Sequence, residues 1–167
     1  MHFAIDKLLD AYRRIGEQRM HGLAIFNQRL EVEAVGFTEW DGHLLGVFIT
    51  PWFMNLVLLP GEQDDWSELA SGTSAAWELP AGEYEFTVNP DTATGVHQSL
   101  SLFTTVTDFP DQQTARAVAR EIIEQILTSG VQHEAKPVES LNERPARVLN
   151  EPMSRRDLLR RFISAEK

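Results

Sequence analysis

The sequence predicts an α+β fold with a mainly antiparallel sheet of about five to seven strands. The prediction rests on two amphipathic stretches typical of helices, at the N-terminus and near residues 111–129, and on several short apolar runs separated by turn residues. A chain of 167 residues, of which 43% are hydrophobic and 24% charged, can bury the core of one domain. We expect that α+β domain to span residues 1–130.

The two helices are predicted from apolar positions that recur every three or four residues. The first begins near the N-terminus and can extend through Gly16 toward Met20, with His21-Gly22 as its end. The second follows Asp111, whose carboxylate can cap free N–H groups, and ends before Gly130. The apolar stripes are Ile5, Leu8, Leu9, Tyr12 and Ile15 in the first helix, and Ala115, Val118, Ala119, Ile122, Ile123, Ile126 and Leu127 in the second.

The strands are predicted from alternation and from turn signals. The strand expected at residues 30–37 begins with alternating apolar and charged side chains, and Asp41-Gly42 is a strong hairpin signal that should pair this strand with residues 44–50. Residues 62–74 are polar and indicate a loop. Further strands are expected around residues 77–79, 84–88 and 96–106.

The most apolar run of the chain is GFTEWDGHLLGVFITPWFMNLVLLPG, residues 36–61. Pro51 cannot donate to a sheet ladder, so it marks an edge, a bulge or a corner between two strands. Trp52, Phe53 and Met54 follow in succession, and neighbours on a strand point to opposite faces, so the three cannot all enter one core. Two interpretations stay open, a strand pair buried on both faces and an apolar patch for a partner segment.

The charge distribution excludes some partners. The net charge is −10, and residues 1–130 hold 7 Lys/Arg against 19 Asp/Glu (−12), whereas residues 131–167 hold 8 against 6 (+2). An acidic body repels nucleic acid and anionic lipid and attracts basic peptides. No run reaches the length of a membrane span and the N-terminus lacks a signal pattern, so we expect a cytoplasmic protein without direct membrane insertion.

No pattern in the sequence favours catalysis. The absence of Cys excludes disulfides, thiolate metal sites and iron–sulfur clusters. The five His residues are not at ligand spacing, and Asp64-Asp65 is more typical of a solvated loop than of a metal site. Phosphate-binding loops and nucleophile elbows are absent. We therefore expect no catalytic, metal or cofactor-binding residues and no cofactor.

The segment ITPWFMNLVLLPG, residues 49–61, resembles the signature of the HybE/HupJ-type [NiFe]-hydrogenase assembly chaperones. Flanking elements occur in the expected order: residues 20–23, residues 33–37 with Trp40, the turn at residues 79–82 followed by Phe86, and Ser99-Leu100. The resemblance covers nearly the whole chain. It implies a non-catalytic chaperone in hydrogenase maturation that binds the small-subunit precursor, with the twin-arginine signal of that precursor as a candidate contact, before assembly and export. Other maturation proteins are further candidate partners. Some relatives carry a rubredoxin module, which needs four Cys that this chain lacks.

The predicted partner-binding residues are large apolar side chains of the central run and its surroundings, since Trp and Met offer adaptable contact area. They are Trp40, Trp52, Phe53, Met54 and Asn55, together with Trp66 and Trp77. Two alternatives remain: a small-ligand-binding α+β domain whose pocket is formed by the same aromatics, and a hydrolase of unrecognised type.

The C-terminal residues 131–167 form a Pro-containing charged arm that should end in a short helix. Its motif Ser154, Arg155, Arg156, Leu158 and Leu159 resembles a twin-arginine signal core, with Leu158 where Phe is usual. No long apolar region follows, so it cannot act as an ordinary export signal. Either it is a capped amphipathic helix that packs on the body, or it mimics the client's signal and occupies the same site. Self-association through the arm is a further expectation.

Overall fold

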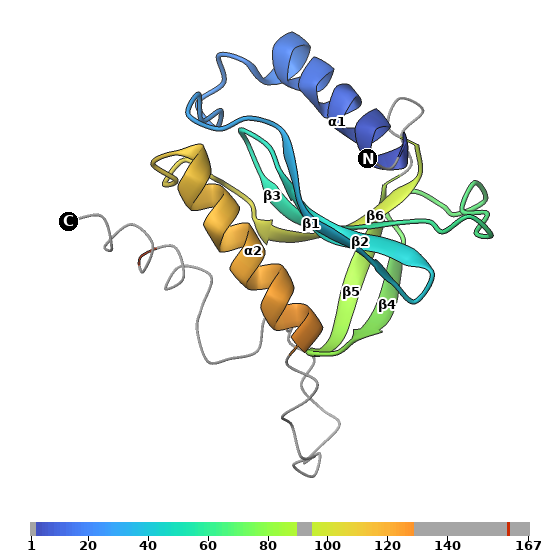
Figure 1. Cartoon of the computed structure of the whole chain (residues 1–167). Coiled ribbons are helices and arrows are strands. Elements are labelled where there is room, and N and C mark those ends of the chain that lie inside the picture. The colour runs from blue at the N-terminus through green and yellow to red at the C-terminus, as the bar shows by residue number, and fades with distance from the viewer. Residues whose placement is uncertain (1–2, 90–94, 129–159, 161–167) are drawn as a thin grey trace, which may run out of the picture.

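The computed structural model describes residues 3–89, 95–128 and 160 (Figure 1). Its elements confirm the predicted α+β class, with six strands, the α-helix α1 before the first strand and the α-helix α2 after the last. The arm motif of Ser154, Arg155, Arg156, Leu158 and Leu159 lies outside the described residues. The elements are α1 (Phe3–Ile15), the π-helix η1 (Gly16–Met20), β1 (Glu33–Trp40), β2 (His43–Ile49), β3 (Met54–Leu59), β4 (Ser74–Leu79), β5 (Gly82–Asn89), β6 (His97–Phe103) and α2 (Gln112–Thr128).

The six strands form one antiparallel sheet in the order β1-β2-β3-β6-β5-β4. The predicted Asp41-Gly42 turn joins β1 to β2, and both residues have positive φ, 47° and 78°. Pro51 stands in the four-residue connection between β2 and β3, which is the corner that its missing N–H predicted. β1 and β4 are therefore the two edges of the sheet.

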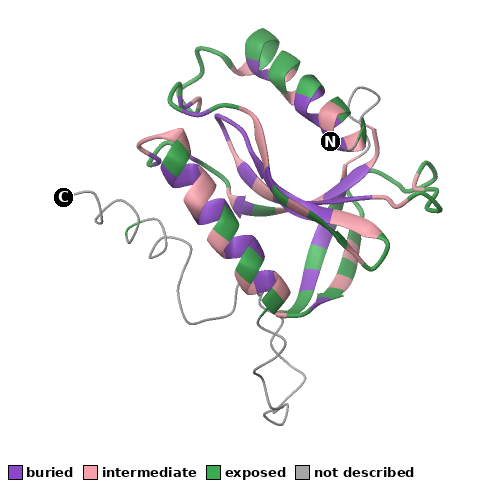
Figure 2. Ribbon diagram, viewed as in Figure 1, coloured by how far each residue is buried: buried purple, intermediate pink, exposed green. Residues whose placement is uncertain are grey.

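The two helices cover opposite faces of the sheet (Figure 1). The larger core lies on the α2 side and the smaller one, which includes Leu8 and Phe48, lies on the α1 side. β2 and β3 are buried on both faces, as the purple bands in Figure 2 show. The central run is thus the two-sided buried strand pair of the first interpretation. No helix in the described part of the chain is long and apolar enough to cross a membrane.

The turn from Thr50 to Phe53 separates the three large side chains of the signature. Thr50 Oγ1 accepts hydrogen bonds from the N–H groups of Trp52 and Phe53, at 3.2 and 2.9 Å, and so closes the turn. Met54 then enters the core on the α2 side, whereas Phe53 packs on the α1 side. Adjacent strand positions facing opposite ways account for this division.

The loops at this end of the sheet meet at the buried side chain of Asn27. Its backbone N–H donates to the Pro51 carbonyl at 2.7 Å. Its Nδ2 donates to the carbonyls of Val106 and Phe109, each at 2.9 Å. Asn27 thereby supplies hydrogen-bond donors to carbonyls of the β2–β3 and β6–α2 connections, and buried carbonyls need such donors.

Helix α2 is fixed at both ends. Asp111 Oδ1 accepts the N–H of Thr114 at 2.7 Å, which confirms the predicted N-cap, and this hydrogen bond holds the pKa of Asp111 below its ordinary value. Near the other end, the N–H of Ala81 in the β4–β5 turn donates to the Ile126 carbonyl at 3.0 Å. The last described turn of α2 is therefore attached to the hairpin that carries β4.

Helix α2 also covers the edge strand β1. Gly36, with φ of 65°, lies where the β1–β2 register is irregular, and a Cβ there would stand 2.8 Å from Ile123 Cγ2. Arg116 binds both oxygens of Glu33, at 2.7 and 3.0 Å. Partial burial raises the pKa of Glu33, but the hydrogen bonds from Arg116 and Gln112 and the charge of Arg116 outweigh it and leave that pKa below its ordinary value.

Candidate partner-binding site

The sheet curls so far that side chains of distant strands meet on its α2 face. The ring of His43 on β2 lies 4.8 Å from that of Trp77 on β4, although three strands stand between these two in the sheet. Trp40 on β1 contacts Trp77 as well, with ring centroids 6.3 Å apart in a T-shaped arrangement. Aromatic side chains therefore link the two edges of the sheet at this end.

A fourth aromatic side chain comes from the loop between β3 and β4. Trp66 stacks on His43 at 5.6 Å and lies 6.2 Å from Trp77. Trp40, His43, Trp66 and Trp77 form one cluster, which we call the tryptophan mouth. Trp77 Nε1 donates to Gln98 Oε1 at 2.8 Å, so a hydrogen bond fixes the ring orientation of that side chain.

Two contacts hold the Trp66 loop against the β1–β2 turn. Asp64 Oδ2 lies 3.0 Å from His43 Nε2 and accepts the N–H of Gly61 at 2.8 Å. His43 Nδ1 lies 2.8 Å from the Asp41 carbonyl, so both ring nitrogens face oxygen acceptors. Gly61 packs so closely that a Cβ would stand 2.0 Å from the Gly42 carbonyl oxygen. The mouth is thereby positioned by backbone packing and by one carboxylate–imidazole contact.

None of the four side chains of the tryptophan mouth is fully buried. Trp40, Trp66 and Trp77 are each partly exposed, and they also touch the α2-side core. Partly exposed, rigidly held Trp rings are typical of residues that contribute most of the energy of an interface. The cluster therefore combines ring-to-ring packing with partial exposure of its tryptophans.

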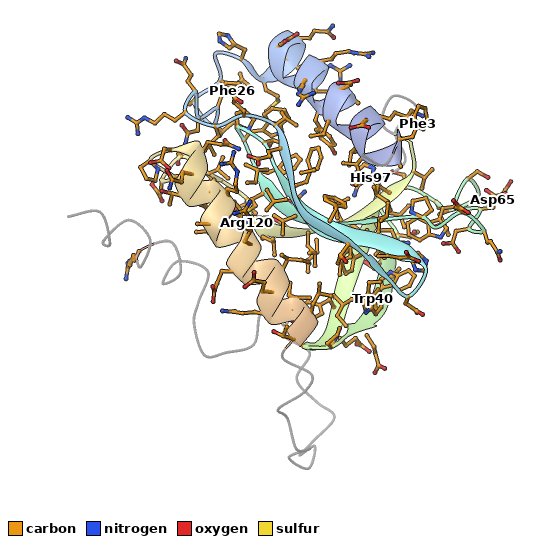
Figure 3. All side chains as sticks on the ribbon, in the orientation of Figure 1. Phe3, Phe26, Trp40, Asp65, His97 and Arg120 are labelled. Atoms are coloured by element: carbon orange, nitrogen blue, oxygen red, sulfur yellow. The ribbon has the colours of Figure 1, made fainter. Side chains whose placement is uncertain are left out.

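The charge around the mouth is negative. Residues 30–115 contain no Lys or Arg but 14 Asp and Glu. Glu39, Asp65, Glu68 and Glu78 are exposed and lie within two residues of a mouth tryptophan along the chain. The basic side chains of residues 1–29, which are Lys7, Arg13, Arg14, Arg19 and Arg29, precede this stretch, and Figure 3 shows Phe26 at the opposite end of the molecule from Trp40 and Asp65.

A second aromatic cluster lies at the other end of β2. Tyr12 of α1 contacts Phe48, Trp52 and Phe53, with ring centroids 5.2 to 6.4 Å apart. Its hydroxyl lies 3.4 Å from Nε2 of the buried His97. Trp52 also packs over Gly16, where a Cβ would stand 3.1 Å from the indole. This cluster attaches α1 and η1 to the sheet and is mostly buried.

The structure does not gather the seven predicted partner-binding residues into one surface. Trp40, Trp66 and Trp77 meet in the mouth, whereas Trp52 and Phe53 lie at the far end of β2, which at about 3.3 Å per residue is about 20 Å away. Met54 is completely buried, and Asn55 is half-buried between Phe48 and Ser101 in the sheet. The aromatics likewise do not form the single ligand pocket of the alternative hypothesis.

Sequence reasoning missed His43 and Asp64. A signal for His43 was present, because Trp40 and His43 flank a two-residue turn and flanking residues of such a turn share one face. Asp64 carried no comparable signal. Among the described residues, no group of three or more His, Asp or Glu side chains could hold a metal ion. Asp65 accepts hydrogen bonds from Ser67, which lower its pKa, as in an ordinary polar loop.

Comparisons with known proteins agree with the sequence resemblance. The family model of the [NiFe]-hydrogenase assembly chaperone HybE matches residues 4–161. The chain is 43% identical over 121 residues to the hydrogenase expression/formation protein HoxT of Azotobacter vinelandii, which covers 71% of this chain and 77% of that protein. It is 38% identical over 119 residues to the probable rubredoxin HupJ of Rhodobacter capsulatus, covering 71% of this chain but only 43% of that protein.

The fold also matches a solved structure. The solution structure of HybE from Escherichia coli superposes with a TM-score of 0.62 at 22% identity, and the match covers 85% of this chain and 91% of that one. The family match spans α1, the whole sheet and α2. The chain therefore belongs to the family of HybE-type [NiFe]-hydrogenase assembly chaperones, which are accessory proteins and not catalysts.

Proposed function

We propose that this chaperone binds the precursor of a hydrogenase small subunit before that subunit is assembled and exported, and that the tryptophan mouth contacts the precursor's twin-arginine signal. One observation carries the proposal: three partly exposed tryptophans lie in a part of the chain that has 14 acidic residues and no Lys or Arg. Arginine is the residue that suits such a surface best. Its guanidinium stacks on indole faces and pairs with carboxylates through two hydrogen bonds.

The same chemistry predicts a reversible complex. A guanidinium over an indole contributes about 0.5–2 kcal/mol, and exposed carboxylates add mainly orientation and association rate. A contact of this kind can shield a signal during assembly and still release it for export. Its strength should fall as the salt concentration rises, because the surrounding carboxylates are exposed.

A binding assay with the full chain tests this proposal. The small-subunit precursor is captured with and without its signal, by the wild type and by Trp66→Ala, with Phe3→Ala as a control that removes an aromatic side chain 84% exposed on α1. We expect capture only when the signal is present, and a loss of at least about tenfold in affinity for Trp66→Ala. Equal capture of both precursor forms would place the contact on the mature subunit.

The arm adds a regulatory element to this proposal. We propose that the segment with Arg155 and Arg156 mimics the client's signal and competes with it for the acidic body. The arm carries a charge of +2 against −12 for residues 1–130, which supports an attraction between the two. Deleting residues 150–167 should then tighten the binding of a synthetic signal peptide. Unchanged or weaker binding would reject mimicry.

A further inference from the structure

The two edge strands of the sheet are protected very differently. β1 carries the irregularity at Gly36 and is covered by α2 through the Arg116–Glu33 pair. β4, with the sequence SAAWEL, pairs with β5 in unbroken register from Ser74 to Leu79 and contains no Pro, Lys or Arg. In the part of the chain that the structure describes, no strand pairs with the other side of β4, and the backbone contact of α2 with this hairpin is at its turn, where Ala81 bonds to Ile126. Exposed edges of this kind readily accept another strand, and most proteins block them.

The register identifies which backbone groups of β4 are available. The N–H of Val88 donates to the Thr73 carbonyl and the Val88 carbonyl accepts the N–H of Gly72, both at 2.9 Å, so the backbone groups of Val88 point toward β4. Bonded and non-bonded pairs alternate along an antiparallel ladder, which places Ala75, Trp77 and Leu79, the partners of Phe86, Tyr84 and Gly82, in the bonded positions. The N–H and C=O groups of Ser74, Ala76 and Glu78 must therefore point away from β5, toward the free edge.

The two faces of this edge differ in chemistry. Trp77 points to the α2 face, where the tryptophan mouth lies. Ser74, Ala76 and Glu78 point to the opposite face, and the exposed Glu83 and Glu85 of β5 lie there too. A strand added beside β4 would present alternate side chains to indole rings on one face and to carboxylates on the other.

We propose that β4 accepts an extended, arginine-bearing segment of the client as a seventh strand of the sheet. The backbone groups of Ser74, Ala76 and Glu78 bind the segment, and its alternate side chains meet the mouth and the carboxylates. An arginine on one face pairs with Glu78 or Glu85, and an apolar or arginine side chain on the other packs against Trp77. The identity of the client rests on the proposed function, whereas the strand-accepting edge does not.

The test uses a 12-residue peptide of alternating Arg and Leu, with a Glu-Leu peptide as the control, and the full chain. Amide hydrogen exchange is measured by NMR with and without peptide. We expect protection of the Ser74, Ala76 and Glu78 amides to rise at least about tenfold with the basic peptide, while the Trp77 amide, already bonded within the hairpin, changes little. The acidic peptide should bind at least about tenfold more weakly.

A matched pair of variants at one position separates the backbone contact from the side-chain contact. Ala76→Pro removes an N–H that points to the free edge and spares the β4–β5 ladder, whereas Ala76→Thr keeps that N–H. We expect Ala76→Pro to weaken peptide binding at least about tenfold and Ala76→Thr to bind as the wild type does. If Ala76→Pro does not fold, two N-methylated peptides replace it, one methylated on the odd residues and the other on the even residues. Only the peptide whose methyl groups point away from β4 should bind.

Two results would overturn the proposal. Protection confined to residues 60–73, with Ala76→Pro binding normally, would mean that side chains of the mouth bind the peptide without strand addition. Protection of the Ser74, Ala76 and Glu78 amides before peptide is added would assign the edge to the chain's own residues instead of the client. Strand addition by the peptide together with no capture of the precursor would refute the proposed function and leave the edge site intact.

Discussion

Replacing Met54 and Trp66 separately by Ala should distinguish a core residue from a binding residue, although both belong to the predicted partner-binding set. Met54 has no exposed surface and packs within the α2-side core. Trp66 is partly exposed on the β3–β4 loop, where it contacts the rings of His43 and Trp77 and packs against the edge of the α2-side core. Met54→Ala should therefore lower stability with little direct effect on binding, and Trp66→Ala should do the reverse.

The magnitudes follow from burial. Truncating a fully buried Met to Ala costs about 2–5 kcal/mol, because transfer free energy is lost and a cavity remains. For a domain of this size each kcal/mol lowers Tm by about 4 °C, so Met54→Ala should lower Tm by about 8–20 °C. Trp66 loses ring contacts on a loop that is partly solvated, and we expect Trp66→Ala to cost about 1 kcal/mol.

Thermal unfolding followed by circular dichroism measures the first effect, and peptide or precursor binding at 15 °C measures the second. At that temperature Met54→Ala should still be folded and should bind within about twofold of the wild type. If Met54→Ala is folded at 15 °C yet does not bind, Met54 is not a core residue alone. If Trp66→Ala unfolds at as low a temperature as Met54→Ala, the mouth is part of the core and not a separate binding surface.

Three further predictions concern single contacts. Glu33→Gln should lower the free energy of unfolding by about 1 kcal/mol at pH 7. The fold lowers the pKa of Glu33 from its ordinary value of 4.5. The extra stability of the wild type over Glu33→Gln should therefore be complete above pH 4.5 and should disappear as pH falls through the pKa of Glu33 in the folded protein. A difference in urea unfolding that does not change with pH would argue against this. Asp111→Ala should cost about 1 kcal/mol through loss of the α2 cap, seen as a lower urea midpoint, while Asp111→Asn retains most of it. Gly61→Ala should displace the Trp66 loop, because its Cβ would overlap the Gly42 carbonyl, and an unchanged indole N–H spectrum of Trp66 would contradict the close packing.

Local sequence signals predicted the elements well because each element carries its own pattern. The apolar stripe of α2 and the carboxylate of Asp111 located that helix to within one residue at its start. The turn residues Asp41 and Gly42 located the β1–β2 hairpin. Even the extension of the first helix to Met20 was predicted, although its π-helical form was not. These features depend on residues that are close in the chain.

The arrangement of the mouth could not be predicted in the same way, because it depends on how far the sheet curls. Nothing local to Trp40 or Trp77 indicates that strands at opposite edges of the sheet contact each other through these rings. The burial of two predicted site residues in the central run could not be predicted for a related reason. Apolar density favours Trp52 and Met54, but density alone does not distinguish a partner surface from a strand pair buried by helices on both faces.

The hydrogen bonds of Asn27 have a consequence for how this protein can vary. Surface loops usually accept insertions independently of one another. Here Asn27 joins its own connection to the one that contains Pro51 and to the one that contains Val106 and Phe109, so a change in the length of any of the three would remove hydrogen bonds that the others share. The loop of residues 60–73, held to the neighbouring turn mainly through Asp64 and Gly61, has no such shared attachment among the described contacts. Length differences between relatives should therefore concentrate in the loop beside the mouth.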